Sequence, residues 1–263
     1  MREYGTREAI NTPPMDTPKM RLYVIRHGHR ADREEGYDGG GNTPLSETGE
    51  QQVEHLAEFV AGEDIDRLYS SCQLRALQTA EAVHRRVDGE WHVWPVFCET
   101  STDTWGDRYR DSPELAERAT VWRTDEPVET PTFEEVEERH GNYYLLSNLA
   151  ERFPDVQLSQ PFPWPDAWWE PREGHTRTMG YARVELGLQA LLDRHDDGDR
   201  IALVCHGNCG DKLMTALMDF PRRQARRFSF DNTGVARLDR RESGEWRIVY
   251  ANRTCHLTPE LQV

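Results

Sequence analysis

Apolar residues along this chain gather in short runs that are separated by longer amphipathic stretches. Residues 21–26 form the first run, rich in Val, Ile and Tyr, and Gly28 follows soon after. This pattern predicts a buried strand that ends at a glycine. Further short runs at 66–70, 93–97 and 200–205 predict strands of the same kind.

Between these runs, apolar residues recur at the three- and four-residue spacing of amphipathic helices. Ser46 is placed to cap one such helix, which would carry Val53, Leu56, Ala57 and Val60 on one side. The same spacing predicts helices over 74–87, 179–194 and 209–218.

Strands and helices therefore alternate along most of the chain, which is typical of α/β proteins. We predict a three-layer α/β sandwich, in which a mostly parallel central sheet carries helices on both faces. In such sheets, ligands bind beyond the carboxyl ends of the strands. Near the C-terminus, residues 234–240 and 246–252 flank Ser243 and Gly244, which predicts a β-hairpin at one side of the sheet.

The alternation fails between Glu99 and Thr178, where Pro, Trp, Tyr and acidic residues become frequent. We predict a single domain over 20–263 that contains an inserted cap at about 100–178, preceded by a flexible, polar N-terminal extension over 1–19. Aromatic side chains dominate burial energetics, so most tryptophans of the insertion are expected to form the cap's own core. These tryptophans are Trp105, Trp122, Trp164, Trp168 and Trp169.

The composition narrows the class of partner. The chain has 263 residues and a formal net charge of -15, from 47 acidic and 32 basic residues, which disfavours nucleic acid and anionic membranes. Its five cysteines include no CxxC pair, and neither a membrane-spanning run nor a signal peptide is evident. A cytoplasmic protein with reduced thiols is expected. Its oligomeric state stays open, a homo-oligomer included.

Residues suited to phosphate chemistry follow three of the predicted strands. Arg26, His27 and Gly28 end the first strand, Arg75 follows the second, and His206 follows the strand over 200–205. Arginine offers bidentate donors that match a phosphate group. Because the carboxyl ends of parallel strands share one edge of a sheet, these side chains are expected to form one pocket for a small phosphate ester.

Each histidine has an expected task. His27 would attack phosphorus through one ring nitrogen and form phosphohistidine, while a hydrogen bond from the other nitrogen to a backbone carbonyl near Gly28 fixes the tautomer. His206 would donate to a phosphoryl oxygen in the transition state. The leaving alkoxide needs a proton, for which Glu99 is the first candidate and Asp103 and Asp107 are the alternatives.

The residues after Gly28 leave alternatives open. Arg30 could bind phosphate or pair with Asp32 or Glu34, and His29 could simply be solvated. A zinc site is a further interpretation, because imidazole and thiolate bind zinc. Flanking arginines repel a cation, so no metal and no other cofactor is predicted. The residues of that alternative are His27, His29, Cys205, His206 and Cys209.

Four ordered motifs between about Met20 and Leu257 carry a family resemblance. They are Arg26-His27-Gly28, Pro44-Leu45-Ser46-x-x-Gly49-x-x-Gln52, Ser70-Ser71-x-x-x-Arg75-Ala76-x-Gln78-Thr79-Ala80 and Cys205-His206-Gly207-Asn208. Together they resemble the histidine phosphatase superfamily, also called phosphoglycerate mutase-like. The resemblance implies that His27 is phosphorylated, that Arg26, Arg75 and His206 bind phosphate, and that Glu99 is the proton donor typical of the first branch.

The segment from Arg26 to Arg30 is similar to the Arg-His-Gly-Glu-Arg form of phosphatase-type members, whose last arginine also contacts phosphate. His29 departs from the usual Glu. Phosphoglycerate mutases carry an asparagine where this chain has Arg33, which favours a phosphatase.

The resemblance implies a metal-independent phosphomonoesterase acting on a small organic phosphate ester through phosphohistidine. A phosphoglycerate mutase-type phosphotransferase and a non-catalytic phosphate-ester-binding module are the alternatives. The family's fold does not decide the substrate.

Overall fold

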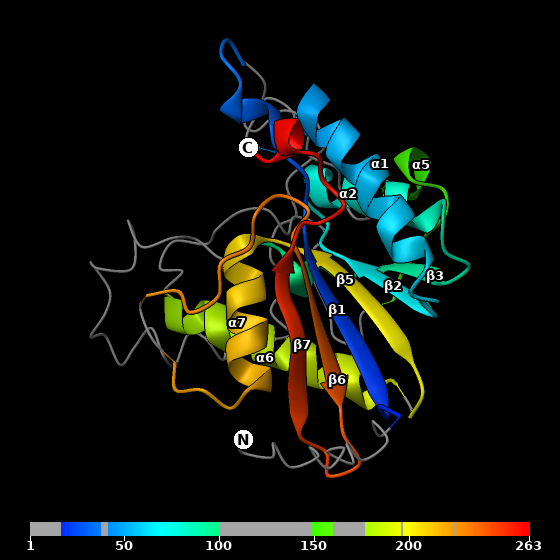
Figure 1. The fold of residues 1–263 in the computed structure, drawn as a ribbon, viewed down its shortest axis with the longest axis vertical. Helices are drawn as coiled ribbons and strands as arrows, with labels where there is room; N and C mark the ends of the chain where they lie inside the picture. The colour runs from blue at the N-terminus through cyan, green and yellow to red at the C-terminus, as the bar shows by residue number, and fades with distance from the viewer. Residues whose placement is uncertain (1–16, 38–41, 100–148, 160–176, 196, 223–224) are drawn as a thin grey trace, which may run out of the picture.

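The computed structural model describes residues 17–37, 42–99, 149–159, 177–195, 197–222 and 225–263. Within them, a seven-stranded sheet has the order β4-β3-β2-β5-β1-β6-β7 (Figure 1). The strands from β4 to β1 run parallel, whereas β6 and β7 are antiparallel to their neighbours. The strands are β1 (Met20–Arg26), β2 (Arg67–Ser70), β3 (Glu90–Val93), β4 (Val156–Leu158), β5 (Arg200–Cys205), β6 (Val235–Arg240) and β7 (Trp246–Arg253).

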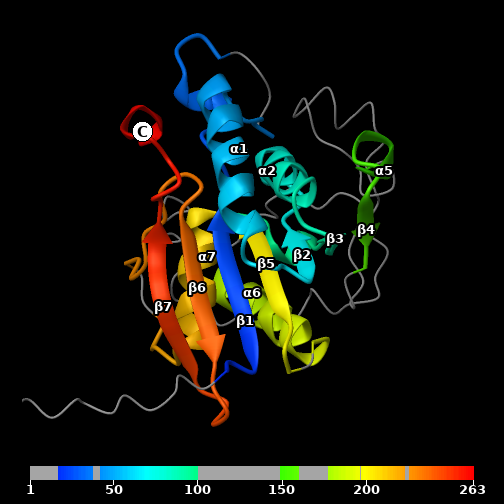
Figure 2. The same ribbon diagram turned by 45° about the vertical axis from the view of Figure 1, so that its right-hand side comes forward.

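Helices cover both faces of this sheet (Figures 1 and 2). α1 and α2 pack on one face, and α6 and α7 pack on the other, which confirms the three-layer α/β prediction. None of the helices in the described ranges is long and apolar enough to cross a bilayer. The helices are α1 (Glu47–Ala61), α2 (Leu74–His84), α5 (Leu149–Arg152), α6 (Arg177–Asp193) and α7 (Gly207–Leu217), with short 3-10 turns at Ala31–Arg33, Pro95–Phe97 and Pro259–Leu261.

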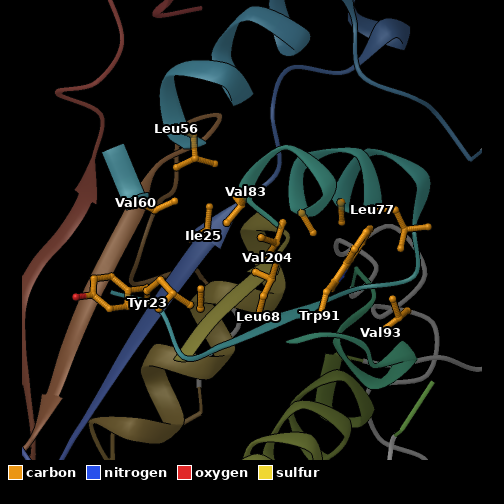
Figure 3. Close-up of a cluster of buried hydrophobic side chains, with 14 of the residues drawn as sticks. Tyr23, Ile25, Leu56, Val60, Leu68, Leu77, Val83, Trp91, Val93 and Val204 are labelled. Atoms are coloured by element: carbon orange, nitrogen blue, oxygen red, sulfur yellow. The ribbon is translucent and has the colours of Figure 1, made fainter. Parts of the chain in front are cut away.

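The central strands are apolar throughout because each contributes to two cores. Tyr23 and Ile25 of β1 face the core beneath α1 and α2 (Figure 3), and Leu22 and Val24 face the core beneath α6 and α7. Successive side chains of a strand point to opposite faces. The continuous apolar run of β1 therefore fits an interior strand, between β5 and β6, that is covered on both faces.

One predicted strand is wrong. The pattern placed it over 93–97, whereas β3 ends at Val93 and Pro95–Phe97 forms a 3-10 turn. Pro95 has no amide hydrogen to offer a strand partner, so the chain leaves the sheet here. Glu99 consequently follows a turn instead of a strand end.

Within the described part of the predicted insertion, residues 149–159, lie two elements. Strand β4 pairs in parallel with β3 and forms an edge of the sheet, and the short helix α5 precedes it. The rest of the predicted cap, including its five tryptophans, Asp103 and Asp107, lies outside the described residues, as do residues 1–16. The boundaries of the cap and of the N-terminal extension therefore stay predictions.

The other element boundaries shift by a few residues. Helix α7 begins at Gly207, two residues before the predicted start, so that His206 occupies its N-cap position. Helix α2 ends at His84 instead of residue 87. The C-terminal hairpin of β6 and β7 is confirmed, and it forms the other edge of the sheet.

The motif around Ser46 fastens α1 to the loop that follows β1. Ser46 Oγ accepts a hydrogen bond from the Gly49 amide at 3.1 Å, as predicted for an N-cap, and lies 2.8 Å from Nδ1 of His29. Gln52 Oε1 accepts from the His29 amide at 2.8 Å. Gly49 packs directly on the His29 carbonyl, where an added Cβ would overlap the oxygen. His29 thus contacts α1 through both its backbone and its ring, and its side chain is only partly exposed.

This contact predicts opposite effects for two glycines of α1. Gly49→Ala should lower the free energy of unfolding by about 1–3 kcal/mol, because the new methyl group must displace the His29 carbonyl. Gly62→Ala, at the other end of α1 with no atom within 4 Å of its Cβ position, should be neutral or stabilising by up to about 1 kcal/mol. Urea unfolding measures both, and equal effects would contradict the contact.

Candidate active site

The carboxyl ends of β1, β5 and β2, neighbours in the sheet, bring the predicted residues together. Arg26 pairs with Cys205 in the ladder between β1 and β5, so the next residues, His27 and His206, lie side by side. Their ring centroids are 5.1 Å apart at an interplanar angle of 57°. The sheet register therefore sets the spacing of the two histidines.

The surroundings of His27 define which nitrogen carries its proton. Nδ1 lies 2.7 Å from the Gly28 carbonyl oxygen, which only accepts hydrogen bonds, so Nδ1 is the N–H donor. This is the predicted backbone hydrogen bond. Nε2 accepts from Nε of Arg75 at 3.2 Å, which requires a lone pair on Nε2. The ring is neutral, and its lone pair on Nε2 is turned toward a guanidinium.

Burial keeps His27 neutral. The side chain is 3% exposed, and this desolvation lowers the pKa of His27 well below its ordinary 6.5, with the charges of Arg75 and Arg26 adding to the effect. An imidazolium here would sit unsolvated next to fixed positive charges. The site thus holds a histidine that is an acceptor at neutral pH.

His206 has the complementary arrangement. Its Nε2 lies 2.8 Å from Ser71 Oγ, and that hydroxyl accepts from the Gln73 amide, so its own proton can go to Nε2. Nδ1 then carries the ring proton, and it is buried without a hydrogen-bond partner among the described residues. Burial, followed by the charge of Arg75, lowers the pKa of His206 well below 6.5.

Two guanidiniums flank the histidines, that of the buried Arg75 and that of the half-buried Arg26. Arg75 reaches them from the first turn of α2, where Nη2 also donates to Gln73 Oε1 at 3.2 Å. Arg26 Nη1 donates to the Phe230 carbonyl at 2.6 Å, while its buried Nε has no partner among the described residues. Burial lowers the pKa of Arg26, opposed by Glu99. The site therefore brings two guanidiniums next to the two histidines.

Arg30 is engaged with protein. Its Nε lies 3.1 Å from Asp32 Oδ1, which is one of the two pairings considered from the sequence. Its charge still contributes to the lowered pKa of His27. A phosphate contact by Arg30 stays a prediction.

Glu99 lies at the start of α7. The Asn208 amide is 3.5 Å from Glu99 Oε2, and the Glu99 amide donates to Gln73 Oε1 at 2.9 Å. Gln73 therefore holds both Arg75 and Glu99 through one side-chain oxygen. The structure places Glu99 beside the residue pair that follows His206.

Gln73 and Arg183 are not among the site residues that were predicted from the sequence. Arg183 of α6 is buried, and its guanidinium donates to the carbonyls of Val96, Cys98 and Glu99 at 3.2, 2.9 and 3.2 Å. A polar residue on an amphipathic helix gives no signal that it is buried. The segment that carries Glu99 is thus held by α6, on the face of the sheet opposite to α1 and α2.

The zinc interpretation finds no support in the geometry. The ring of His29 binds Ser46 and is committed to α1, away from a shared ligand set with His27. Across the ranges that the structure describes, no group of three or more His, Cys, Asp or Glu side chains is arranged to hold a metal ion.

Comparison with known families decides the class. The model of the histidine phosphatase superfamily (branch 1) matches residues 22–143 and 141–254. The chain belongs to this superfamily. The match includes every candidate residue, from Arg26 to His206, in the order in which the motifs occur.

Named relatives agree with this membership. The adenosylcobalamin/alpha-ribazole phosphatase of Salmonella typhimurium is 34% identical over 137 residues, which are 51% of this chain and 65% of that protein. The chain thus spans about two thirds of the length of that relative. The probable phosphoglycerate mutase GpmB of Yersinia pestis is 24% identical over 243 residues, 90% of this chain and 95% of that protein.

A solved structure shares the fold. The putative alpha-ribazole-5'-P phosphatase of Escherichia coli superposes with a TM-score of 0.57 at 22% identity, covering 89% of this chain and 97% of that one. The two sequence relatives thus carry the names of a phosphatase and of a probable phosphoglycerate mutase.

The two neutral histidines predict how stability depends on pH. Below about pH 6.5 both rings become protonated in the unfolded chain but stay neutral in the folded chain. The unfolded state then binds more protons, so the free energy of unfolding decreases as the pH is lowered. Between pH 7.5 and 5.5, His27 and His206 should each remove about 1 kcal/mol from the free energy of unfolding. Urea unfolding of His206→Asn should show a correspondingly smaller loss, and an unchanged pH slope would contradict the buried neutral state.

Proposed function

We propose that this chain is a metal-independent phosphomonoesterase that hydrolyses small organic phosphate esters through a phosphohistidine at His27. The observation that carries the proposal is the lone pair on His27 Nε2, held neutral and 3.2 Å from the Arg75 guanidinium. A phosphoryl group drawn to Arg75 would lie next to that lone pair. The superfamily membership and the phosphatases among the relatives support the same reaction.

In the first step, Nε2 of His27 attacks phosphorus and the bond between phosphorus and the ester oxygen breaks. The Gly28 carbonyl stabilises the positive charge that develops on the ring, because it accepts the Nδ1 proton. Glu99 transfers its proton to the leaving alkoxide. The alcohol departs, and the phosphoryl group stays on Nε2.

In the second step, water attacks the phosphohistidine. The Glu99 carboxylate takes a proton from this water, the bond between phosphorus and Nε2 breaks, and inorganic phosphate leaves. The electron pair returns to Nε2, and Glu99 is protonated again. Both half-reactions use the same groups in reverse roles.

The transition state of each step gathers charge on the phosphoryl oxygens, so fixed donors matter more than covalent chemistry. Arg26 and Arg75 supply guanidinium donors, and the unpartnered Nδ1–H of His206 supplies a neutral one. The amino end of α7, which begins immediately after His206, adds the positive end of a helix dipole. Removing one donor of this kind raises the barrier by about 3 kcal/mol.

Replacement of the nucleophile tests the proposal. His27→Ala should abolish hydrolysis of an aryl phosphate assayed in excess chelator, whereas His55→Ala on α1 should retain it. A wild-type protein that stays active in chelator, together with an inactive His27→Ala variant, supports a metal-independent reaction. Wild-type rates from His27→Ala would contradict it.

The role of Glu99 predicts a dependence on the leaving group. Glu99→Gln should slow hydrolysis of an alkyl phosphate by about 10²–10⁴-fold, because an alkoxide needs a proton to leave. A nitrophenyl phosphate, whose leaving group is stable as an anion, should be affected far less. The measurement is kcat/KM for both esters, with the exposed Glu50→Gln as control. Equal losses for the two esters would remove Glu99 from proton transfer.

The same preparation separates hydrolysis from the mutase alternative. Purified protein supplied with 3-phosphoglycerate should release inorganic phosphate. Rapid exchange between phosphoglycerate isomers without phosphate release would instead show that the phosphohistidine is protected from water, as a phosphotransferase requires.

A further inference from the structure

Arg226 is a positively charged residue at the pocket that the proposed hydrolysis does not use. It lies in the segment between α7 and β6, and its Nε donates to Oδ1 of Asn208 at 2.6 Å. Asn208 follows His206 and Gly207 in the first turn of α7, and its amide lies 3.5 Å from Glu99 Oε2. Arg226 therefore borders the pocket on the side of Glu99 and the α7 terminus.

Arg226 and Arg26 approach the same glycine. A Cβ built on Gly207 would lie 3.7 Å from Nη1 of Arg226 and 3.8 Å from Nε of Arg26. The charge of Arg226 is also among the causes that lower the pKa of Arg26, after burial. The two guanidiniums are thus close neighbours, one inside the pocket and one at its rim.

The partner of Arg226 does not neutralise it. Asn208 offers a neutral amide oxygen, and among the described residues no carboxylate lies within ion-pair distance of Arg226. Two other arginines of the region are paired with carboxylates, since Arg222 binds Glu185 and Arg30 binds Asp32. Arg226 is exposed, so water solvates its guanidinium in the free protein, and an anion bound there would interact with the charges of both Arg226 and Arg26. With Nε used by Asn208, the two terminal nitrogens remain for that anion.

We propose that Arg226 forms a second anion subsite, so that the preferred substrates carry a carboxylate a few bonds from the phosphate that is cleaved. The inference rests on the proposed phosphatase function and names its substrate class. The planar pair of terminal nitrogens on Arg226 matches a carboxylate. The phosphate would lie between Arg26 and Arg75, and the carboxylate would reach outward past Gly207 to Arg226.

Two ligands that differ only in the carboxylate test this subsite. 3-Phosphoglycerate and glycerol 3-phosphate share the same three-carbon phosphate ester, with a carboxylate in one and a hydroxymethyl group in the other. Arg226→Gln should raise KM for 3-phosphoglycerate about tenfold while leaving glycerol 3-phosphate within about twofold and kcat unchanged for both. Arg226→Lys, which keeps the charge, should recover part of the loss.

Arg222→Gln is the matched control, because Arg222 lies in the same segment but is paired with Glu185. It should behave as wild type toward both ligands. Arg226→Gln effects that are equal for the two ligands, or absent for both, would overturn the subsite.

Binding measurements test the Arg226 subsite independently of the proposed phosphatase activity. The same two compounds are titrated into wild type and Arg226→Gln by calorimetry, which reads the preference without turnover. If wild type hydrolyses neither compound nor an aryl phosphate, the phosphatase proposal fails, and the calorimetric difference still decides the subsite. If wild type hydrolyses both compounds without preference and binds them equally, the subsite fails and the phosphatase stands.

Discussion

The hydrogen bond between Nδ1 of His27 and the Gly28 carbonyl, together with the Arg75 guanidinium at Nε2, is the contact on which the site depends. A buried imidazole between fixed positive charges cannot hold a second proton at neutral pH. It therefore keeps its lone pair where a phosphate would be bound. Without that constraint the same residues would be a cluster of cations with no nucleophile.

Helices α1 and α2, which pack on the same face of the sheet, hold the loop after β1 in place. Thr79 of α2 links the two partners of His27, because its Oγ1 accepts from the Gly28 amide and donates to the Arg75 carbonyl. On the other side of Gly28, the His29 amide and carbonyl are fastened to α1 through Gln52 and Ser46. Motif residues such as Gln52 and Thr79 thus hold the loop after β1, whereas Arg26, His27, Arg75 and His206 of the same motifs form the candidate site itself.

The sequence predicted what depends on local pattern and chemistry. Apolar runs located β1, β2 and β5, and the ends of these strands gave Arg26, His27, Arg75 and His206. Pro95 redirected the predicted strand before Glu99 into a turn, because a missing amide hydrogen outweighs the apolar character of its neighbours. Arg183 and Arg226 could not be found, since their roles arise from contacts between α6 or the segment after α7 and residues distant in sequence.

Transfer of the phosphoryl group through Nε2 of His27 is the central step of the proposed reaction. Rapid mixing with an aryl phosphate, an alkaline quench that preserves phosphoramidates, and phosphorus NMR with peptide mapping would locate the trapped group. The predicted result is a single phosphohistidine at His27, substituted on Nε2, that disappears as phosphate is released. Phosphate on Nδ1, on His206, or on no histidine during active turnover would contradict the claim.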